Sequence, residues 1–150
     1  MMAEEYGFFD STESDIRYYS AGNFNGLASL LFTDGVIGDS NSLKCTSRNF
    51  TVTIQPGGAF INGYWYQNTS ALDLATTAPA TTRYDRVVLR LNLVSKTIKA
   101  VYRKGSSSSY PSLYNTANYV EISLSKLVVS STQIISVTDE RTFATFRGGT

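Results

Sequence analysis

Five carboxylates are the residues of this sequence best suited to chemistry. A pair of Asp or Glu side chains can act as general acid and nucleophile in a glycosidase, or share one proton in an acid protease. The candidates are Asp73, Asp85, Glu121, Asp139 and Glu140. Asp85 precedes Arg86, and Asp139-Glu140 precede Arg141, so we interpret these acids as partners in salt bridges at strand ends. We therefore predict no catalytic residue and no enzymatic activity.

The residues needed for most other catalytic or metal sites are missing. The chain contains no histidine, which excludes Ser/His and Cys/His triads and removes the commonest metal ligand. Its one cysteine, Cys45, has no second thiolate to share a zinc ion, and we interpret it as a small buried apolar residue. We expect neither a metal nor a cofactor. With 13 basic and 12 acidic residues, the chain lacks the positive field that nucleic acid needs.

Tyr64, Trp65 and Tyr66 could form a platform for sugar rings, because aromatic side chains offer broad apolar faces. Successive strand residues point to opposite faces, however, so Tyr64 and Tyr66 share one face and Trp65 occupies the other. We predict that Trp65 packs in the protein core, and that the two tyrosines cover a sheet face or an interface. A stand-alone module that recognises host cell-wall glycans is the alternative function.

The composition favours strands as the elements that position these residues. The chain of 150 residues is the size of one domain, and we interpret residues 1–150 in that way. It is rich in Thr, Val, Ile and Tyr, which fit a half-buried pleated surface. About seven strands, expected between residues 43 and 141, predict a mainly β fold, an antiparallel β-sandwich with one N-terminal helix at an edge. The serine-rich stretch Gly105–Pro111 is expected to be a flexible loop.

A tight turn is the strongest local signal within the strand region. Asn62-Gly63 lies between two apolar runs. This pair favours a two-residue type I′ turn, because both central residues of such a turn need positive φ. We therefore predict that Asn62 and Gly63 set the register of a central hairpin.

The single helix is predicted over residues 20–34. Ser20 is a suitable N-cap, and an apolar face follows at helical spacing. That face consists of Phe24, Leu27, Ala28 and Leu31. Asp34-Gly35 is expected to end the helix, with Gly35 in the left-handed conformation just beyond it.

Residues 1–19 are predicted to form an extended N-terminal arm. Its first 15 residues include five acidic residues and no basic one, a pattern typical of a solvated segment. A docking strand for a neighbouring molecule is the alternative. Because Tyr6, Phe8 and Phe9 lie in this arm, we expect these aromatics to seal the helix onto the sandwich and leave the isolated chain a monomer.

Three stretches taken together resemble a known group of proteins. They are Tyr6-Gly-Phe-Phe-Asp10 followed by the predicted helix, Val52-Thr-Ile-Gln-Pro-Gly-Gly-Ala-Phe-Ile-Asn-Gly-Tyr-Trp-Tyr66, and Tyr84-Asp-Arg-Val-Val-Leu-Arg-Leu91. In this order they resemble tail and baseplate proteins of long-tailed bacteriophages of Gram-positive hosts, among them small tail-associated proteins of Bacillus siphophages. The likeness extends over most of the chain, to Thr138-Asp-Glu-Arg141.

The resemblance implies a fold and a role. The fold is a β-sandwich with an N-terminal helix, similar to the shoulder domain of lactococcal phage receptor-binding proteins. The role is structural or attachment-associated within the phage tail, in a protein made in the host cytoplasm that contacts other tail or baseplate proteins. No stretch matches a saccharide-binding head, so receptor binding is not implied. Insertion into a membrane is not expected, because the apolar stretches are too short to span a bilayer.

Overall fold

Two β layers enclose the hydrophobic core of the protein. The structure, a computed structural model, describes residue 4 and residues 6–148, so positions 1–3 and 5 of the predicted arm lie outside the described residues. The strands are β1 (Gly35–Ile37), β2 (Cys45–Arg48), β3 (Thr51–Ile54), β4 (Gly57–Ile61), β5 (Tyr64–Asn68), β6 (Leu72–Ala75), β7 (Arg83–Asn92), β8 (Thr97–Arg103), β9 (Tyr119–Val129) and β10 (Ile134–Asp139). The mainly β sandwich with one helix is confirmed.

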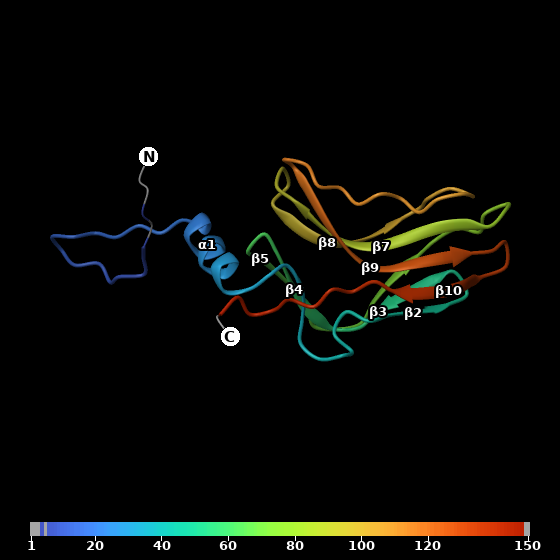
Figure 1. Ribbon diagram of the computed structural model, residues 1–150, viewed down its shortest axis with the longest axis horizontal. Coiled ribbons are helices and arrows are strands. Elements are labelled where there is room, and N and C mark those ends of the chain that lie inside the picture. The colour runs from blue at the N-terminus through green and yellow to red at the C-terminus, as the bar shows by residue number, and fades with distance from the viewer. Residues whose placement is uncertain (1–3, 5, 149–150) are drawn as a thin grey trace.

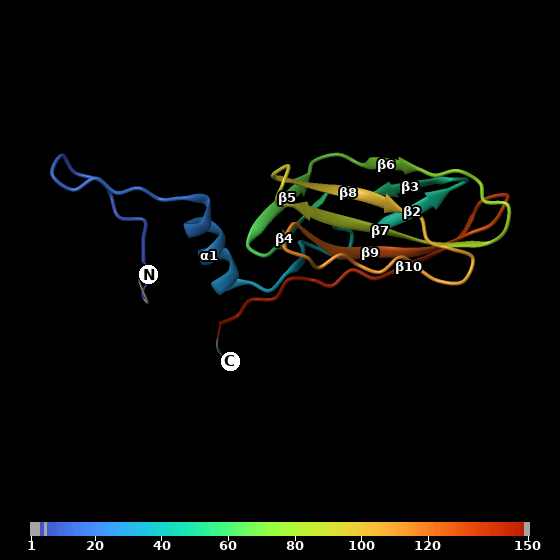
Figure 2. The same ribbon diagram turned by 90° about the horizontal axis from the view of Figure 1, so that it is seen from above.

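One layer is a four-stranded sheet and the other consists of two smaller sheets. The large sheet has the order β10-β9-β7-β8, and the three-stranded sheets have the orders β2-β3-β6 and β1-β4-β5. All pairings between these strands are antiparallel. The helix and the arm lie beyond one end of the sandwich, next to β4 and β5 (Figures 1 and 2). The described residues form more strands than the seven expected, because short pieces such as the polar β2 carry no apolar alternation.

Strand alternation builds the core. In β7, Val87, Leu89 and Leu91 are buried against the opposite layer, as their period of two predicts. In β5, Tyr64 and Tyr66 pack against the same core, whereas Trp65 is 71% exposed. The prediction of a core tryptophan is therefore wrong. Alternation correctly predicts that Tyr64 and Tyr66 share one face of β5. It does not predict which face is buried, and the buried face is the one that carries the tyrosines.

The Asn62-Gly63 turn is confirmed. Ile61 pairs with Tyr64 across a two-residue loop, with φ of 50° at Asn62 and 81° at Gly63. The backbone N–H of Asn62 donates to a carboxylate oxygen of Asp34 at 2.9 Å. The turn therefore sets the β4–β5 register and also binds the segment that follows the helix.

The helix α1 spans Ala21–Leu31 and is shorter than predicted. Ser20 precedes it as expected, and the side-chain oxygen of Asn23 accepts the backbone N–H of Ser20 at 2.8 Å. The helix ends before Gly35, because Phe32 is already extended, with φ of −135°. The prediction of Gly35 as the residue that terminates the helix is wrong.

Gly35 instead begins β1 and allows a close approach of the C-terminal segment. Its φ is 147°, and a Cβ atom there would lie 2.5 Å from the carbonyl oxygen of Thr142. The neighbouring Val36 N–H donates to that same oxygen at 2.8 Å, and the Ala144 N–H donates to the Val36 oxygen at 2.9 Å. A glycine is needed at position 35 because any side chain would push this segment away.

The serine-rich stretch predicted to be a flexible loop is held against the outer face of the large sheet. The Tyr84 N–H donates to the Ser106 oxygen at 2.9 Å, and the Arg86 guanidinium donates to the Pro111 oxygen at 2.7 Å. Arg103 donates to the carbonyl oxygen of Ser112. Composition indicates a loop correctly, but it cannot reveal that arginines of β7 and β8 bind the backbone of this segment.

Arg141 joins the end of β10 to the loop before β2. Its guanidinium donates to the carbonyl oxygens of Ser40 and Ser42 at 2.9 and 2.7 Å, and it pairs with Asp139 at 2.8 Å. The hydrogen bond from Arg141 lowers the pKa of the Asp139 carboxyl from 3.8 to about 2. The predicted local salt bridge between Asp139 and Arg141 is confirmed.

Gly63→Val should destabilise the protein by at least about 1–3 kcal/mol, because a β-branched residue at positive φ is strained. The new Cβ would also collide with the backbone oxygen of Asn25 in α1. Thermal unfolding measures the effect. Gly26→Ala is the matched control, since no atom lies within 4 Å of its added Cβ, and it should leave the Tm unchanged or raise it. An unchanged Tm in Gly63→Val would contradict the role of the turn.

Asp139 should contribute a small pH-dependent stability. A carboxyl whose pKa is lowered on folding stabilises the folded state at pH values above its unfolded pKa. This stabilisation is lost as the pH falls from 3.8 through about 2. Because the Asp139 side chain is 56% exposed, the contribution should be below about 1 kcal/mol. Urea unfolding measures the effect. The difference in unfolding free energy between the wild type and Asp139→Asn should shrink as the pH falls from about 4 to about 2. A difference that grows toward low pH would contradict the assignment.

Candidate functional site

Asp85 is fully buried, and its carboxylate accepts hydrogen bonds from three residues. It accepts hydrogen bonds from Arg83 Nε at 2.8 and 2.9 Å, from the Tyr102 hydroxyl at 2.6 Å and from the Gly105 N–H at 2.9 Å. Burial, and then Asp85 itself, raises the pKa of Tyr102, so that its hydroxyl stays protonated and donates. The predicted pairing of Asp85 with Arg86 is wrong, because adjacent strand residues face opposite sides and the partner two positions away shares the face.

Glu121 is the buried carboxylate of the opposite face of the large sheet. It accepts hydrogen bonds from Arg90 at 2.8 Å, from Arg103 at 2.7 Å and from the Tyr114 N–H at 3.0 Å. Glu140 nearby accepts from Arg86 at 3.1 Å. A pocket of about 320 Å³ adjoins Glu121 and Glu140, and each of these two carboxylates is already paired with arginine. These carboxylates hold strands and the serine-rich segment together.

Large apolar side chains are exposed on the arm and on α1. We call this the arm–helix surface, formed by Tyr6, Phe9, Ile16, Tyr18, Phe24, Leu27 and Leu30. Tyr18 is 85% exposed and Leu30 is 76% exposed, and α1 buries none of its residues. The predicted apolar helix face is therefore present, but it faces solvent and does not pack on the sandwich.

The arm folds back onto the helix through Phe8. The Phe8 ring lies 5.0 Å from the Tyr19 ring and 4.8 Å from the Phe24 ring, measured between centroids. The Tyr19 hydroxyl also accepts the Phe9 N–H at 2.6 Å. The expectation that Tyr6, Phe8 and Phe9 seal the helix onto the sandwich is wrong, because the arm lies on the side of α1 away from the sandwich (Figures 1 and 2).

A second group of aromatic side chains lies on the outer face of the β1-β4-β5 sheet. The Phe32 ring stacks on the Phe60 ring at 5.5 Å and contacts the Phe146 ring at 6.0 Å. Trp65 pairs with Phe60 across the hairpin and so lies on the same face. We call these four residues the aromatic ladder; Phe32 and Phe146 lie more than 100 positions apart, so the group could not be recognised from the sequence.

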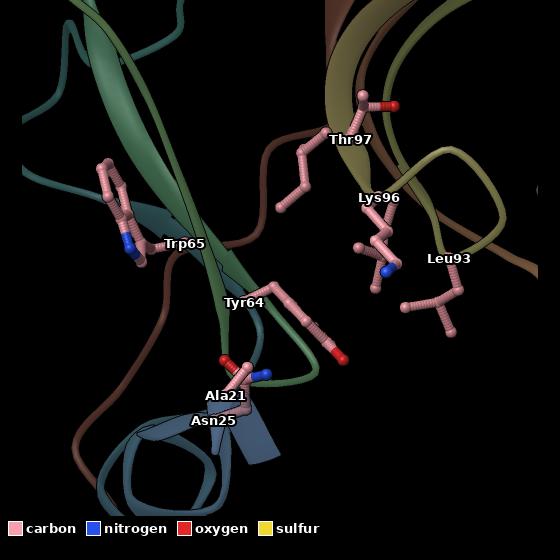
Figure 3. Close-up of a pocket in the computed structure, with 9 residues that line it drawn as sticks. Ala21, Asn25, Tyr64, Trp65, Leu93, Lys96 and Thr97 are labelled. Atoms are coloured by element: carbon pink, nitrogen blue, oxygen red, sulfur yellow. The ribbon is translucent and has the colours of Figure 1, made fainter. Parts of the chain in front are cut away.

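A pocket of about 490 Å³ opens where α1 meets the ends of two hairpins (Figure 3). Ala21 and Asn25 reach it from the helix, and Tyr64 points into it from β5. The opposite wall is formed by Leu91, Leu93, Lys96, Thr97 and Ile98 of the β7–β8 hairpin. Trp65 also lines the pocket, but its ring points away from the other lining side chains, so Tyr64 and Trp65 do not form one sugar platform.

The structure brings together part of the predicted set of interface residues. Asn62, Gly63 and Tyr64 meet at the helix end of the sandwich, and Tyr66 packs in the core. Asn25 and Lys96, which line the pocket, were missed because neither belongs to any sequence motif. Cys45 is half-buried against the core, which agrees broadly with its predicted apolar role.

Among the described residues, no cluster of three or more potential ligands could hold a metal ion. In the same part of the chain, no helix has the length and hydrophobicity to cross a bilayer. Comparisons of the chain with models of protein families, with curated proteins and with solved structures found no match.

Asp85→Asn should cost about 3–5 kcal/mol of stability, because it leaves the largely buried Arg83 without a counter-charge. Asp73→Asn is the control; Asp73 is exposed and accepts a single bond from Thr53, so we expect a cost of about 1 kcal/mol or less. Urea unfolding measures both.

The purified wild type should hydrolyse no wall glycan, and hydrolysis that Asp85→Asn abolished would contradict a purely structural role.

Proposed function

We propose that this protein is a non-enzymatic structural or attachment-associated module of a bacteriophage tail or baseplate, which works through contacts with other tail proteins in the virion. The observation that carries the proposal is the arm–helix surface. Its side chains lie on a helix and an arm that project from an otherwise well-packed sandwich (Figure 1). Side chains of this size are normally buried, so their position on a projecting element favours a contact with another protein.

The area of the arm–helix surface is consistent with a protein contact. Aromatic side chains can bury about 150–250 Å² each, so seven large side chains that are 44–85% exposed offer on the order of 500 Å² or more. A standard interface takes about 800 Å² from each partner, and its core is poor in charge and rich in aromatic residues. The apolar side chains of the arm–helix surface are suited to such a core, and the acidic residues of the arm are suited to its polar rim.

The motifs that resemble phage tail proteins support the choice of partner. One of those motifs contributes to the surface, because Tyr6-Gly-Phe-Phe-Asp10 forms part of the arm. A second lies beside it, because Asn62-Gly63 anchors the hairpin next to α1. The buried carboxylates, which are the main candidates for catalysis, are paired with arginines. Together these points favour a module that assembles over one that catalyses.

A stand-alone carbohydrate-binding module is the second candidate, and the exposure of Trp65 favours it. An exposed tryptophan on a sheet can stack on a sugar ring. Binding of isolated wall glycans that is lost in Trp65→Ala would support this function. Without such binding, the aromatic ladder is better explained as part of a protein interface.

Immunogold labelling with an antibody against this protein should mark the tails of virions of a phage that encodes it. Leu30→Glu should reduce its incorporation into tails by about tenfold or more, because a charge would be placed in the apolar contact. Ile135→Glu, which changes an exposed apolar residue of β10, should leave incorporation unchanged. Unlabelled tails, or equal loss in both variants, would contradict the proposed contact.

The isolated chain should be a monomer in solution. Its arm folds back on its own helix, so the Phe8 contact is satisfied within one chain. Sedimentation at micromolar concentration should give a mass near 16.5 kDa. A mass near three times this value would contradict the prediction and would favour a trimeric attachment protein.

A further inference from the structure

The pocket between α1 and the two hairpins has the features of a small-molecule site. Its volume of about 490 Å³ lies within the range of about 300–1,000 Å³ typical of ligand pockets. Most of its wall is apolar, supplied by the Tyr64 ring and by Leu91, Leu93 and Ile98. A few polar groups converge on it, which is the usual arrangement for fixing the orientation of a ligand.

Asn25 presents an unused hydrogen-bond donor at this pocket. Its side-chain Nδ2 is buried from solvent and has no hydrogen-bond partner. A buried amide without an acceptor is unfavourable, and the great majority of buried polar groups are paired. Rotation of the Asn25 side chain toward the pocket would bring Nδ2 within reach of a ligand oxygen, which would supply the missing acceptor.

Lys96 gives the pocket a positive charge. It lies in the β7–β8 turn with φ of 59°, and its side chain extends toward the space that faces Tyr64 (Figure 3). It takes part in none of the ion pairs found among the described residues. The charge of the pocket is therefore complementary to an anionic group.

We propose that this pocket binds an acidic sugar. The carboxylate of the sugar pairs with the Lys96 ammonium, its C–H face stacks on the Tyr64 ring, and one of its oxygen atoms accepts from Asn25 Nδ2. A sugar fits better than an aliphatic acid, because the hydroxyl group of Tyr64 at the pocket can bond to a ring hydroxyl. This inference does not depend on the proposed tail contacts, which use other side chains.

The test is a titration of the full-length ¹⁵N-labelled protein with D-glucuronate, followed by NMR. We expect saturable shifts of the Asn25 side-chain amide and of the Lys96 and Thr97 backbone amides, with a Kd on the order of 1 mM. D-Glucose, which lacks the carboxylate, should bind at least about tenfold more weakly. The absence of shifts at Asn25, or equal binding of glucose, would overturn the proposal.

Two variants separate binding from folding. Asn25→Leu should weaken glucuronate binding about tenfold and also raise the Tm of the free protein, because the unpaired amide is removed. Lys96→Asn should weaken binding similarly, since asparagine tolerates the positive φ of that turn but carries no charge. Leu30→Glu, which changes a residue outside the pocket lining, should bind as the wild type does. Full affinity in Asn25→Leu or in Lys96→Asn would overturn the proposal.

Discussion

The structure depends on the burial of β7 on both of its faces. One face carries Val87, Leu89 and Leu91 into the sandwich core, and Val88 on the other face is equally inaccessible. A strand at the surface of a two-layer sandwich normally leaves one face to solvent. Here the segment between β8 and β9 covers the outer face, and it is held there by arginines of β7 and β8. The four-stranded sheet and its covering segment therefore stabilise one another.

Buried carboxylates make this double burial possible. Asp85 binds Arg83, Tyr102 and the start of the covering segment on one face, and Glu121 binds two arginines and Tyr114 on the other. A buried charge is tolerated only where it is paired and hydrogen-bonded, and both are. With the sandwich stabilised in this way, the apolar side chains of the arm and α1 are not needed for its core. They are available for a contact with another protein.

Local features of the fold could be predicted from the sequence, and long-range ones could not. The Asn62-Gly63 turn and the Ser20 helix start depend on neighbouring residues alone, so their patterns were sufficient. Alternation placed Trp65 opposite Tyr64 and Tyr66, but only the packing of the sheets decides which face is buried. The two arginines that bind Glu121 lie 31 and 18 positions away, and a side chain such as Asn25 becomes part of a pocket only when the hairpins meet the helix.

Hydrogen exchange of the free chain, compared with the chain in purified phage tails, tests the central claim most directly. Amide protection reports which segments become covered on assembly. The account predicts increased protection across residues 6–31, which carry the arm–helix surface, and little change in β7 and β9, which are already buried in the free chain. Unchanged exchange across residues 6–31 in tails that contain the protein would contradict it.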